Sequence, residues 1–172
     1  MPITPAVSIV LPFRDEAAHL PECLESIRRQ TLAGWELLAI DDGSEDDSPE
    51  TVRRLTDEDP RVRLLRPGRV GLVAALNLGI AEARAPLLAR MDADDVMHPE
   101  RLAAQREYLE RRSELALAAC RVELFPEERV QAGYREYVRW QNECEEPGEV
   151  AANLYVESPF AHPSVMARTE VL

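Results

Sequence analysis

Three carboxylates, Asp92, Asp94 and Asp95, directly follow a short apolar segment at residues 86–89. Such a run predicts a buried strand that carries the acidic cluster at its carboxyl end. Side chains two positions apart in an extended chain point the same way, so Asp92 and Asp94 could meet at one ion. Two carboxylates, completed by water and phosphate oxygens, commonly hold Mg²⁺ or Mn²⁺ beside a diphosphate. The alternative is a set of solvated loop acids before a helix.

The charge balance argues against nucleic acid as a partner. The 172 residues include 32 acidic and 20 basic side chains, a net charge of −12, and no strongly basic stretch is present. An acidic protein that handles an anionic nucleotide needs a metal ion or a local basic pocket. Every basic residue is arginine. The absence of lysine excludes a Walker phosphate loop, a Schiff base and a lysine-assisted phospho-aspartate site.

The cysteines and the start of the chain predict a cytoplasmic protein. Cys23, Cys120 and Cys144 are far apart and have no metal-ligand spacing, which is typical of reduced thiols. Residues 1–5 lack the charged flank and apolar stretch of a signal peptide. No segment reaches the length of a membrane span, so membrane contact is not visible in this sequence.

Strand and helix patterns alternate through the first two thirds of the chain. This alternation predicts an α/β fold with a parallel sheet and right-handed crossovers, in one domain over residues 1–172. The expected strands are 6–12, 35–40, 61–65 and 86–89, and the expected helices are 17–30, 48–59, 70–84 and 99–113.

The pattern is weaker after Pro126. We expect a strand at 115–125, helices at 127–141 and 150–156, and a final extended segment at 158–168. The aromatic side chains of Tyr134, Tyr137 and Trp140 cluster in the first of these helices, where they either stack on a sugar ring or pack internally. The chain stops at Leu172 without a closing element, which predicts a domain truncated at its C-terminal end.

Five segments in this order and spacing resemble the N-terminal portion of the family 2 glycosyltransferases, which have the GT-A fold. The resemblance extends from Val7 to Met166 and implies a Rossmann-like, mostly parallel sheet with helices on both faces. The segments are VSIVLPFRDE at 7–16, LLAIDDGSEDDS at 37–48, GLVAALNLGIAEA at 71–83, ARMDADD at 89–95 and AHPSVMAR at 161–168.

The resemblance implies transfer of a sugar from a nucleotide-diphosphate donor, expected to be a UDP-sugar, to an acceptor hydroxyl with inversion at the anomeric carbon. The acceptor is an unknown sugar or lipid. The expected cofactor is Mn²⁺ or Mg²⁺, because a divalent cation stabilises the negative charge that develops on the leaving diphosphate.

The resemblance also assigns donor-binding roles. Pro12, Arg14 and Glu16 match positions around the base and ribose. Asp42 matches a carboxylate that accepts a hydrogen bond from the base, and it can distinguish a base with an imide N–H from one without it. Asp92 matches a position near the ribose and the metal, and Asp94 matches the direct metal ligand.

Further positions follow from the same resemblance. Asp95 matches a frequent third acid. His162 matches a position near the diphosphate or metal, and the alternative is a packed or surface histidine. Asn77 is expected at the donor site, but Leu76 stands where many relatives have an arginine, so Arg66 or Arg69 would have to replace that arginine.

The catalytic residue is not identified in this sequence. Inverting relatives use an aspartate as general base, and it is expected beyond Leu172. The chain could therefore bind a nucleotide sugar without efficient transfer.

Three other function classes are alternatives to a glycosyltransferase. One alternative is a non-catalytic nucleotide-sugar-binding module. Another is a metal-dependent phosphatase, because Asp92-Ala93-Asp94-Asp95-Val96 satisfies the Asp-x-Asp-x-Val pattern of haloacid-dehalogenase-like enzymes. Those enzymes place the motif after the first strand and add a lysine. A nucleotidyltransferase would need a glycine-rich basic loop, which residues 12–16 lack.

Overall fold

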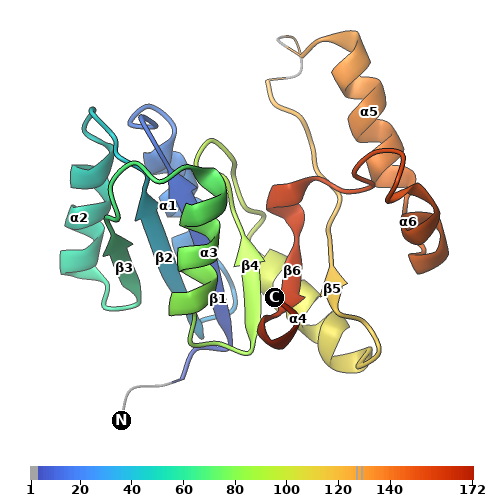
Figure 1. The fold of residues 1–172 in the computed structure, drawn as a ribbon, viewed down its shortest axis with the longest axis horizontal. Coiled ribbons are helices and arrows are strands. Elements are labelled where there is room, and N and C mark those ends of the chain that lie inside the picture. Colours follow the sequence, from blue (N-terminus) through green and yellow to red (C-terminus); the bar gives the residue numbers. More distant parts are fainter. Residues whose placement is uncertain (1–3, 127, 129) are drawn as a thin grey trace.

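One six-stranded sheet forms the centre of the protein (Figure 1). The computed structural model describes residues 4–126, 128 and 130–172. The strand order is β3-β2-β1-β4-β6-β5; the first four strands are parallel, and β6 pairs antiparallel with both β4 and β5. The strands are β1 (Val7–Phe13), β2 (Trp35–Asp41), β3 (Val62–Leu65), β4 (Leu87–Arg90), β5 (Leu117–Ala118) and β6 (Met166–Arg168).

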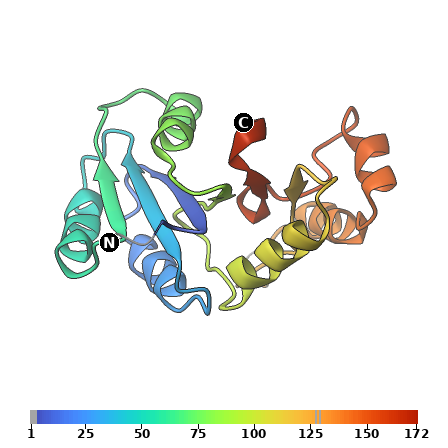
Figure 2. The ribbon, with the colours of Figure 1, turned by 90° about the horizontal axis from the view of Figure 1, so that it is seen from below.

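Helices cover both faces of the sheet, which confirms the predicted fold class. Seen from below, α3 lies on one side of the parallel strands and α1 on the other (Figure 2). In Figure 1, α5 and α6 stand apart from the parallel strands. The helices are α1 (Leu20–Arg28), α2 (Ser48–Glu58), α3 (Leu72–Glu82), α4 (Arg101–Arg111), α5 (Ala132–Glu143) and α6 (Pro147–Asn153).

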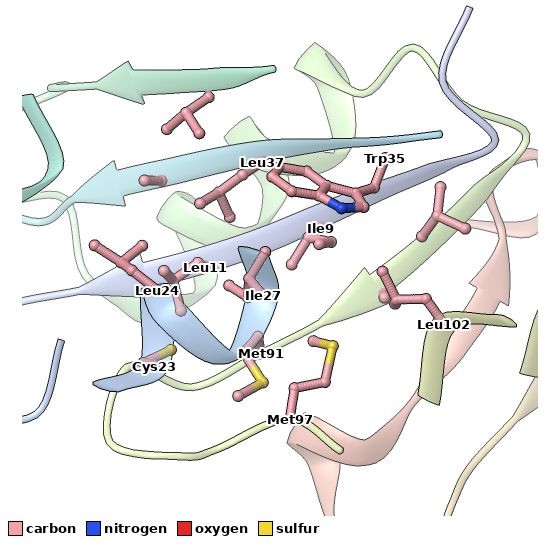
Figure 3. Close-up of a cluster of buried hydrophobic side chains, with 14 of the residues drawn as sticks. Ile9, Leu11, Cys23, Leu24, Ile27, Trp35, Leu37, Met91, Met97 and Leu102 are labelled. Carbon is pink, nitrogen blue, oxygen red and sulfur yellow. The ribbon is translucent and has the colours of Figure 1, made fainter. Parts of the chain in front are cut away.

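The two faces bury alternate residues of the same strands. Ile9 and Leu11 of β1 pack with α1 and with Leu37 of β2 (Figure 3), whereas Val10 packs with Ala75 of α3 on the opposite face. Successive side chains of a strand point to opposite faces, so a strand covered on both sides needs a continuous apolar run. This requirement explains the unbroken apolar sequence of β1.

The order of the strands places a crevice beside β1. The chain runs from β1 to β2 and β3 on one side, and then returns to place β4 on the other side of β1. In open α/β sheets such a reversal separates the loops at the carboxyl ends of the two neighbouring strands, and ligands bind there. The loops after β1 and β4 are therefore the expected site.

Two predictions about the second half of the chain require correction. The strand predicted at 115–125 is only Leu117–Ala118, because its partner β6 offers just three residues for pairing. The extended segment predicted at 158–168 contains a 3₁₀ helix, η2 (His162–Ser164), and only β6 is a strand. The antiparallel pairing of β6 with β4 and β5 agrees with the mostly parallel sheet that the resemblance implies.

Helix boundaries also differ in this region. The short helix predicted at 150–156 is α6, which begins earlier because Glu146 and Glu149 form a capping box at its start. Part of the helix predicted at 127–141 falls on Glu127 and Arg129, outside the described residues, and α5 covers Ala132–Glu143. A 3₁₀ helix, η3 (Thr169–Val171), ends the chain. Among the described residues, none of the helices combines the length and apolar character needed to cross a membrane.

Close packing of α3 on the sheet depends on Gly79. A Cβ atom at this position would lie 2.4 Å from Cγ1 of Val10 and 3.2 Å from Cδ1 of Ile40. We expect Gly79→Ala to lower the free energy of unfolding by about 1–3 kcal/mol, because an added methyl group forces α3 from the sheet. Urea unfolding measures this change. Gly133→Ala in α5 is the control: nothing lies within 4 Å of its added Cβ, so no loss is expected. Equal losses in both variants would contradict the packing argument.

Candidate active site

A cavity of about 240 Å³ lies at the carboxyl ends of β1, β2 and β4. It opens at the strand-order reversal, where the fold predicts a ligand site. Six residues singled out from the sequence line it, although they are spread over more than eighty positions of the chain. The lining residues are Pro12, Phe13, Arg14, Glu16, Asp42, Leu72, Arg90, Asp92, Ala93 and Asp94.

The loops after β1 and β2 are joined by hydrogen bonds that position Arg14 and Glu16. Asp15 adopts a left-handed backbone conformation with φ of 55°, which is uncommon for a residue with a side chain. Its carboxylate and backbone N–H both contact the second loop, so the conformation is fixed. The backbone N–H groups of Asp15, Glu16 and Ala17 donate to Ser44 Oγ (3.1 Å), Ser48 Oγ (2.8 Å) and Asp46 Oδ2 (2.9 Å), and Glu45 N–H donates to Asp15 Oδ1 (2.8 Å).

Asp42 has one carboxylate oxygen engaged by the protein. Its Oδ1 accepts the backbone N–H groups of Val70 (2.7 Å) and Gly71 (2.8 Å), just before α3. Among the described residues, Oδ2 accepts no hydrogen bond from a protein group. The carboxylate is thus held in a fixed orientation while one oxygen remains for a ligand in the cavity.

Arg66 is held by Asp41 at the end of β2 and does not line the cavity. Its Nε donates to Oδ2 of the buried Asp41 (3.1 Å), and Ser44 N–H donates to Oδ1 of the same carboxylate (2.8 Å). Because Asp41 is only 1% exposed, loss of its partner would leave a buried charge unpaired. Arg66 therefore secures the loop that leads to α3, and Arg69 lies exposed on that loop.

The acidic segment is a turn rather than an extension of the strand. β4 ends at Arg90, and Asp95 N–H donates to the carbonyl of Asp92 (3.3 Å). The extended geometry predicted for Asp92 and Asp94 is therefore wrong. Their carboxylates still lie on the same, outward side of the turn, because Met91 before Asp92 and Ala93 between the two are buried.

Apolar contacts beneath the turn fix this arrangement. Met91 and Met97 lie close to Cys23 of α1 in the core (Figure 3). The Cys23 thiol donates a weak hydrogen bond to the carbonyl of Asp92 (3.5 Å). Burial raises the pKa of this thiol to about 12, so Cys23 is a packing residue and not a nucleophile at neutral pH.

Arg90 is a residue of the cavity that the sequence analysis did not single out. Its Nη2 donates to both carboxylate oxygens of Asp92, at 3.0 and 3.2 Å. The side chain is 19% exposed, and its Nε is buried with no hydrogen-bond partner. The available signal was an arginine inside a segment otherwise typical of a buried strand.

Arg101 and Gln105 of α4 connect the end of β4 to the segment just before β6. Neither residue was identified from the sequence. Arg101 Nη2 donates to the carbonyls of Arg90 (3.0 Å) and Val165 (3.4 Å). Gln105 Nε2 donates to the carbonyl of Ser164 (2.8 Å). Both side chains are buried, so α4 fixes the position of the segment that contains His162.

Comparison with known proteins decides the family. The family model described as glycosyl transferase family 2 matches residues 8–172. The chain belongs to glycosyl transferase family 2. It is 35% identical over 97 residues to the putative glycosyltransferase EpsH of Bacillus subtilis, and 30% identical over 96 residues to the hyaluronan synthase of Pasteurella multocida. Each match covers 56% of this chain, but only 28% and 10% of those relatives.

Solved structures share the fold. TarS 1–349 of S. aureus superposes with a TM-score of 0.76 at 17% identity, over 96% of this chain and 48% of TarS. The mannosyltransferase PcManGT of Pyrobaculum calidifontis, solved with GDP-Man and Mn²⁺, gives a TM-score of 0.71 at 22% identity, over 98% of this chain and 46% of that enzyme. The architecture is that of the GT-A glycosyltransferases. The chain spans about half of each of these structures.

Within this family 2 chain, three of the expected site residues do not line the cavity. Asn77 lies on the exposed side of α3, and His162 is exposed at the start of η2. Asp95 is half-buried in the acidic turn. The remaining expected residues, Pro12, Arg14, Glu16, Asp42, Asp92 and Asp94, all line it.

The carboxylate oxygens at this cavity suit a cation that is also coordinated by a bound ligand. Among the described residues, no cluster of three or more His, Cys, Asp or Glu side chains could bind a metal ion without help from a ligand. Asp92 and Asp94 supply two hard oxygen donors at one cavity. Mg²⁺ typically takes one or two carboxylates together with phosphate and water oxygens, so these residues fit such an ion.

The acidic turn has an unusual titration. Burial, together with the charges of Asp94 and Asp92, raises the pKa of Asp95 to about 6. We expect NMR of the side-chain carboxyl carbon to show a midpoint near 6 in metal-free protein, and Asp94→Asn to lower it by removing a negative charge. Because the unfolded pKa is about 4, the stability that Asp95 contributes is present below that value and lost as pH rises through about 6. A midpoint near 4 would contradict its burial.

Proposed function

We propose that the protein binds a UDP-sugar with a divalent cation and transfers the sugar to an acceptor hydroxyl with inversion at the anomeric carbon. The observation that carries this proposal is the cavity beside β1, where loops from three strands bring together Arg14, Glu16, Asp42, Asp92 and Asp94. Family membership supports glycosyl transfer. The donor, the metal and the stereochemistry are the parts that we propose.

The base-binding part of the proposal rests on Asp42. Its Oδ1 is held by two backbone N–H groups, and its Oδ2 remains to accept a hydrogen bond from the imide N–H of uracil. Pro12, Arg14 and Glu16 border the same cavity and would surround the base and ribose. A structure of TarS 1–349 was solved with UDP-GlcNAc, which supports a uridine nucleotide as the first one to test.

The metal-binding part rests on the acidic turn. Asp94 would be the direct ligand of Mn²⁺ or Mg²⁺, and Asp92 would contact both the metal and the ribose. When bound, the cation supplies positive charge to the diphosphate as it leaves. The Mn²⁺ in the PcManGT structure supports a divalent ion. His162 is a proposed neighbour of the diphosphate or metal, Asn77 is a proposed donor contact, and Asp95 is a third acid without an assigned task.

The acceptor is proposed only by chemical class, a sugar or lipid hydroxyl. Inversion requires that this hydroxyl attack the anomeric carbon from the side opposite the diphosphate, after a general base takes its proton. No residue of this chain is assigned that role. The three cysteines are free thiols, which agrees with the proposed cytoplasmic location.

Metal-dependent nucleotide binding is the first test. We expect UDP to bind in the presence of Mn²⁺, and Asp94→Asn to weaken this binding at least about tenfold, because the cation loses a ligand. Isothermal titration calorimetry measures both affinities. Asp57→Asn, on the exposed side of α2, is the matched control and should bind like the wild type. If UDP, GDP and TDP all fail to bind with Mn²⁺ present, the proposed function is wrong.

Base recognition is tested by Asp42→Asn. The amide oxygen can still accept the N–H groups of Val70 and Gly71, which leaves an NH₂ donor facing the uracil imide N–H. We expect UDP affinity to fall about tenfold to a hundredfold, because a charged acceptor becomes a mismatched donor. CDP, whose base presents an acceptor at the same ring position, should lose none of its affinity. An equal loss for UDP and CDP would show that the substitution disturbs the loop and not base recognition.

A further inference from the structure

The guanidinium of Arg90 has more hydrogen-bond donors than the protein uses. An arginine side chain carries five N–H donors in one plane. Among the described residues, the only side-chain hydrogen bonds of Arg90 run from Nη2 to Asp92, and Nε is buried without a partner. Nε is out of reach of solvent, but among the described residues Nη1 is neither bonded to a protein group nor fully buried, so Nη1 is the donor left for a ligand in the cavity.

The other arginines near the cavity, Arg14, Arg66 and Arg69, are all more exposed than Arg90. Arg14 lines the cavity, but its side chain is 38% exposed and forms an ion pair with Asp15 at 3.4 Å. Arg66 is bound to Asp41. Arg90 is only 19% exposed, so its charge is less screened by water than that of Arg14.

Charge neutralisation of Asp92 does not account for the whole side chain. One nitrogen, Nη2, makes both contacts to that carboxylate. The cavity is lined by four carboxylates, those of Glu16, Asp42, Asp92 and Asp94, and by two arginines. An anion that enters such a site needs a positively charged protein group besides any metal ion.

We propose that Arg90 binds the diphosphate of the donor directly while it orients Asp92. In this arrangement Nη2 keeps its contact with Asp92, and N–H groups elsewhere on the guanidinium donate to an anionic phosphate oxygen. The planar fork of arginine suits simultaneous contacts to a carboxylate and a phosphate, which the single ammonium of lysine does not. The inference rests on the proposed function, because it concerns the same cavity and the same donor.

The test compares UDP with uridine, which lacks the diphosphate. Wild type and Arg90→Gln are titrated with each ligand by calorimetry, once with saturating Mn²⁺ and once with EDTA. We expect Arg90→Gln to weaken UDP binding about tenfold or more under both conditions, with uridine affinity unchanged within about twofold. Arg106→Gln, an exposed arginine of α4 paired with Glu110, is the matched control and should behave like the wild type.

Other outcomes overturn the inference in distinguishable ways. An equal loss for UDP and uridine would show that Arg90 only supports the local structure. A loss of UDP affinity that occurs with Mn²⁺ but not with EDTA would show that Arg90 acts through the metal ligand Asp92. If the wild type binds UDP with Mn²⁺ but shows no preference for UDP over uridine in EDTA, the proposed function stands. A direct contact between Arg90 and the diphosphate is then rejected.

A second variant covers the case in which Arg90→Gln fails to fold, since that substitution leaves Asp92 unpaired. Arg90→Lys retains the positive charge but loses the fork. We expect its affinity for UDP to lie between those of the wild type and of Arg90→Gln, and its affinity for uridine to be unchanged. UDP binding equal to that of the wild type would show that the fork makes no contact with the phosphates.

Discussion

The pairing of β1 with both β2 and β4 is the constraint on which the rest of the structure depends. β1 is buried on both faces, and its register aligns Val10 with Leu38 on one side and with Arg90 on the other. This register brings the loops that follow the three strands to one edge of the sheet. Asp42 and the acidic turn, about fifty residues apart in sequence, become neighbours at one cavity because of it.

Most of the acidic residues near this edge have structural tasks. Asp15, Asp41 and Asp46 accept backbone N–H groups of the loops after β1 and β2. A carboxylate that accepts backbone N–H groups satisfies donors that a loop would otherwise leave to water. The acidic composition of this region is therefore not simply a metal site. Among the described residues, the carboxylates that line the cavity are those of Glu16, Asp42, Asp92 and Asp94.

The sequence predicted the fold and the main cavity residues well, for physical reasons. Apolar runs bounded by glycine, proline and acidic residues mark parallel strands, and parallel strands place the residues that follow them at one edge. The pattern could not predict β5, because the length of a strand depends on its partner and not on its own apolar residues. It predicted an extended conformation for Asp92–Asp94, since the alternation of apolar and acidic residues is the same in a strand and in this turn.

The missed residues Arg101 and Gln105 donate to backbone carbonyls of other segments. Arg101 binds carbonyls of Arg90 and Val165, and no periodicity marks such a contact. Arg66 was a candidate for phosphate binding, but the buried Asp41 engages its guanidinium. A charge on a loop can be assigned to a ligand only after the protein groups that compete for it are known.

Competition for charge also explains how three carboxylates can lie close together in the acidic turn. Asp92, Asp94 and Asp95 lie within four residues, and full ionisation of all three carboxylates would be unfavourable in a partly buried site. Arg90 offsets the charge of Asp92, Asp94 is exposed to solvent, and burial raises the pKa of Asp95 to about 6. The repulsion is thus reduced in a different way at each carboxylate: by an ion pair at Asp92, by solvent at Asp94 and by a raised pKa at Asp95. In the proposed function, a divalent ion at Asp94 would meet an Asp92 already held by Arg90, and the two cations would share this carboxylate.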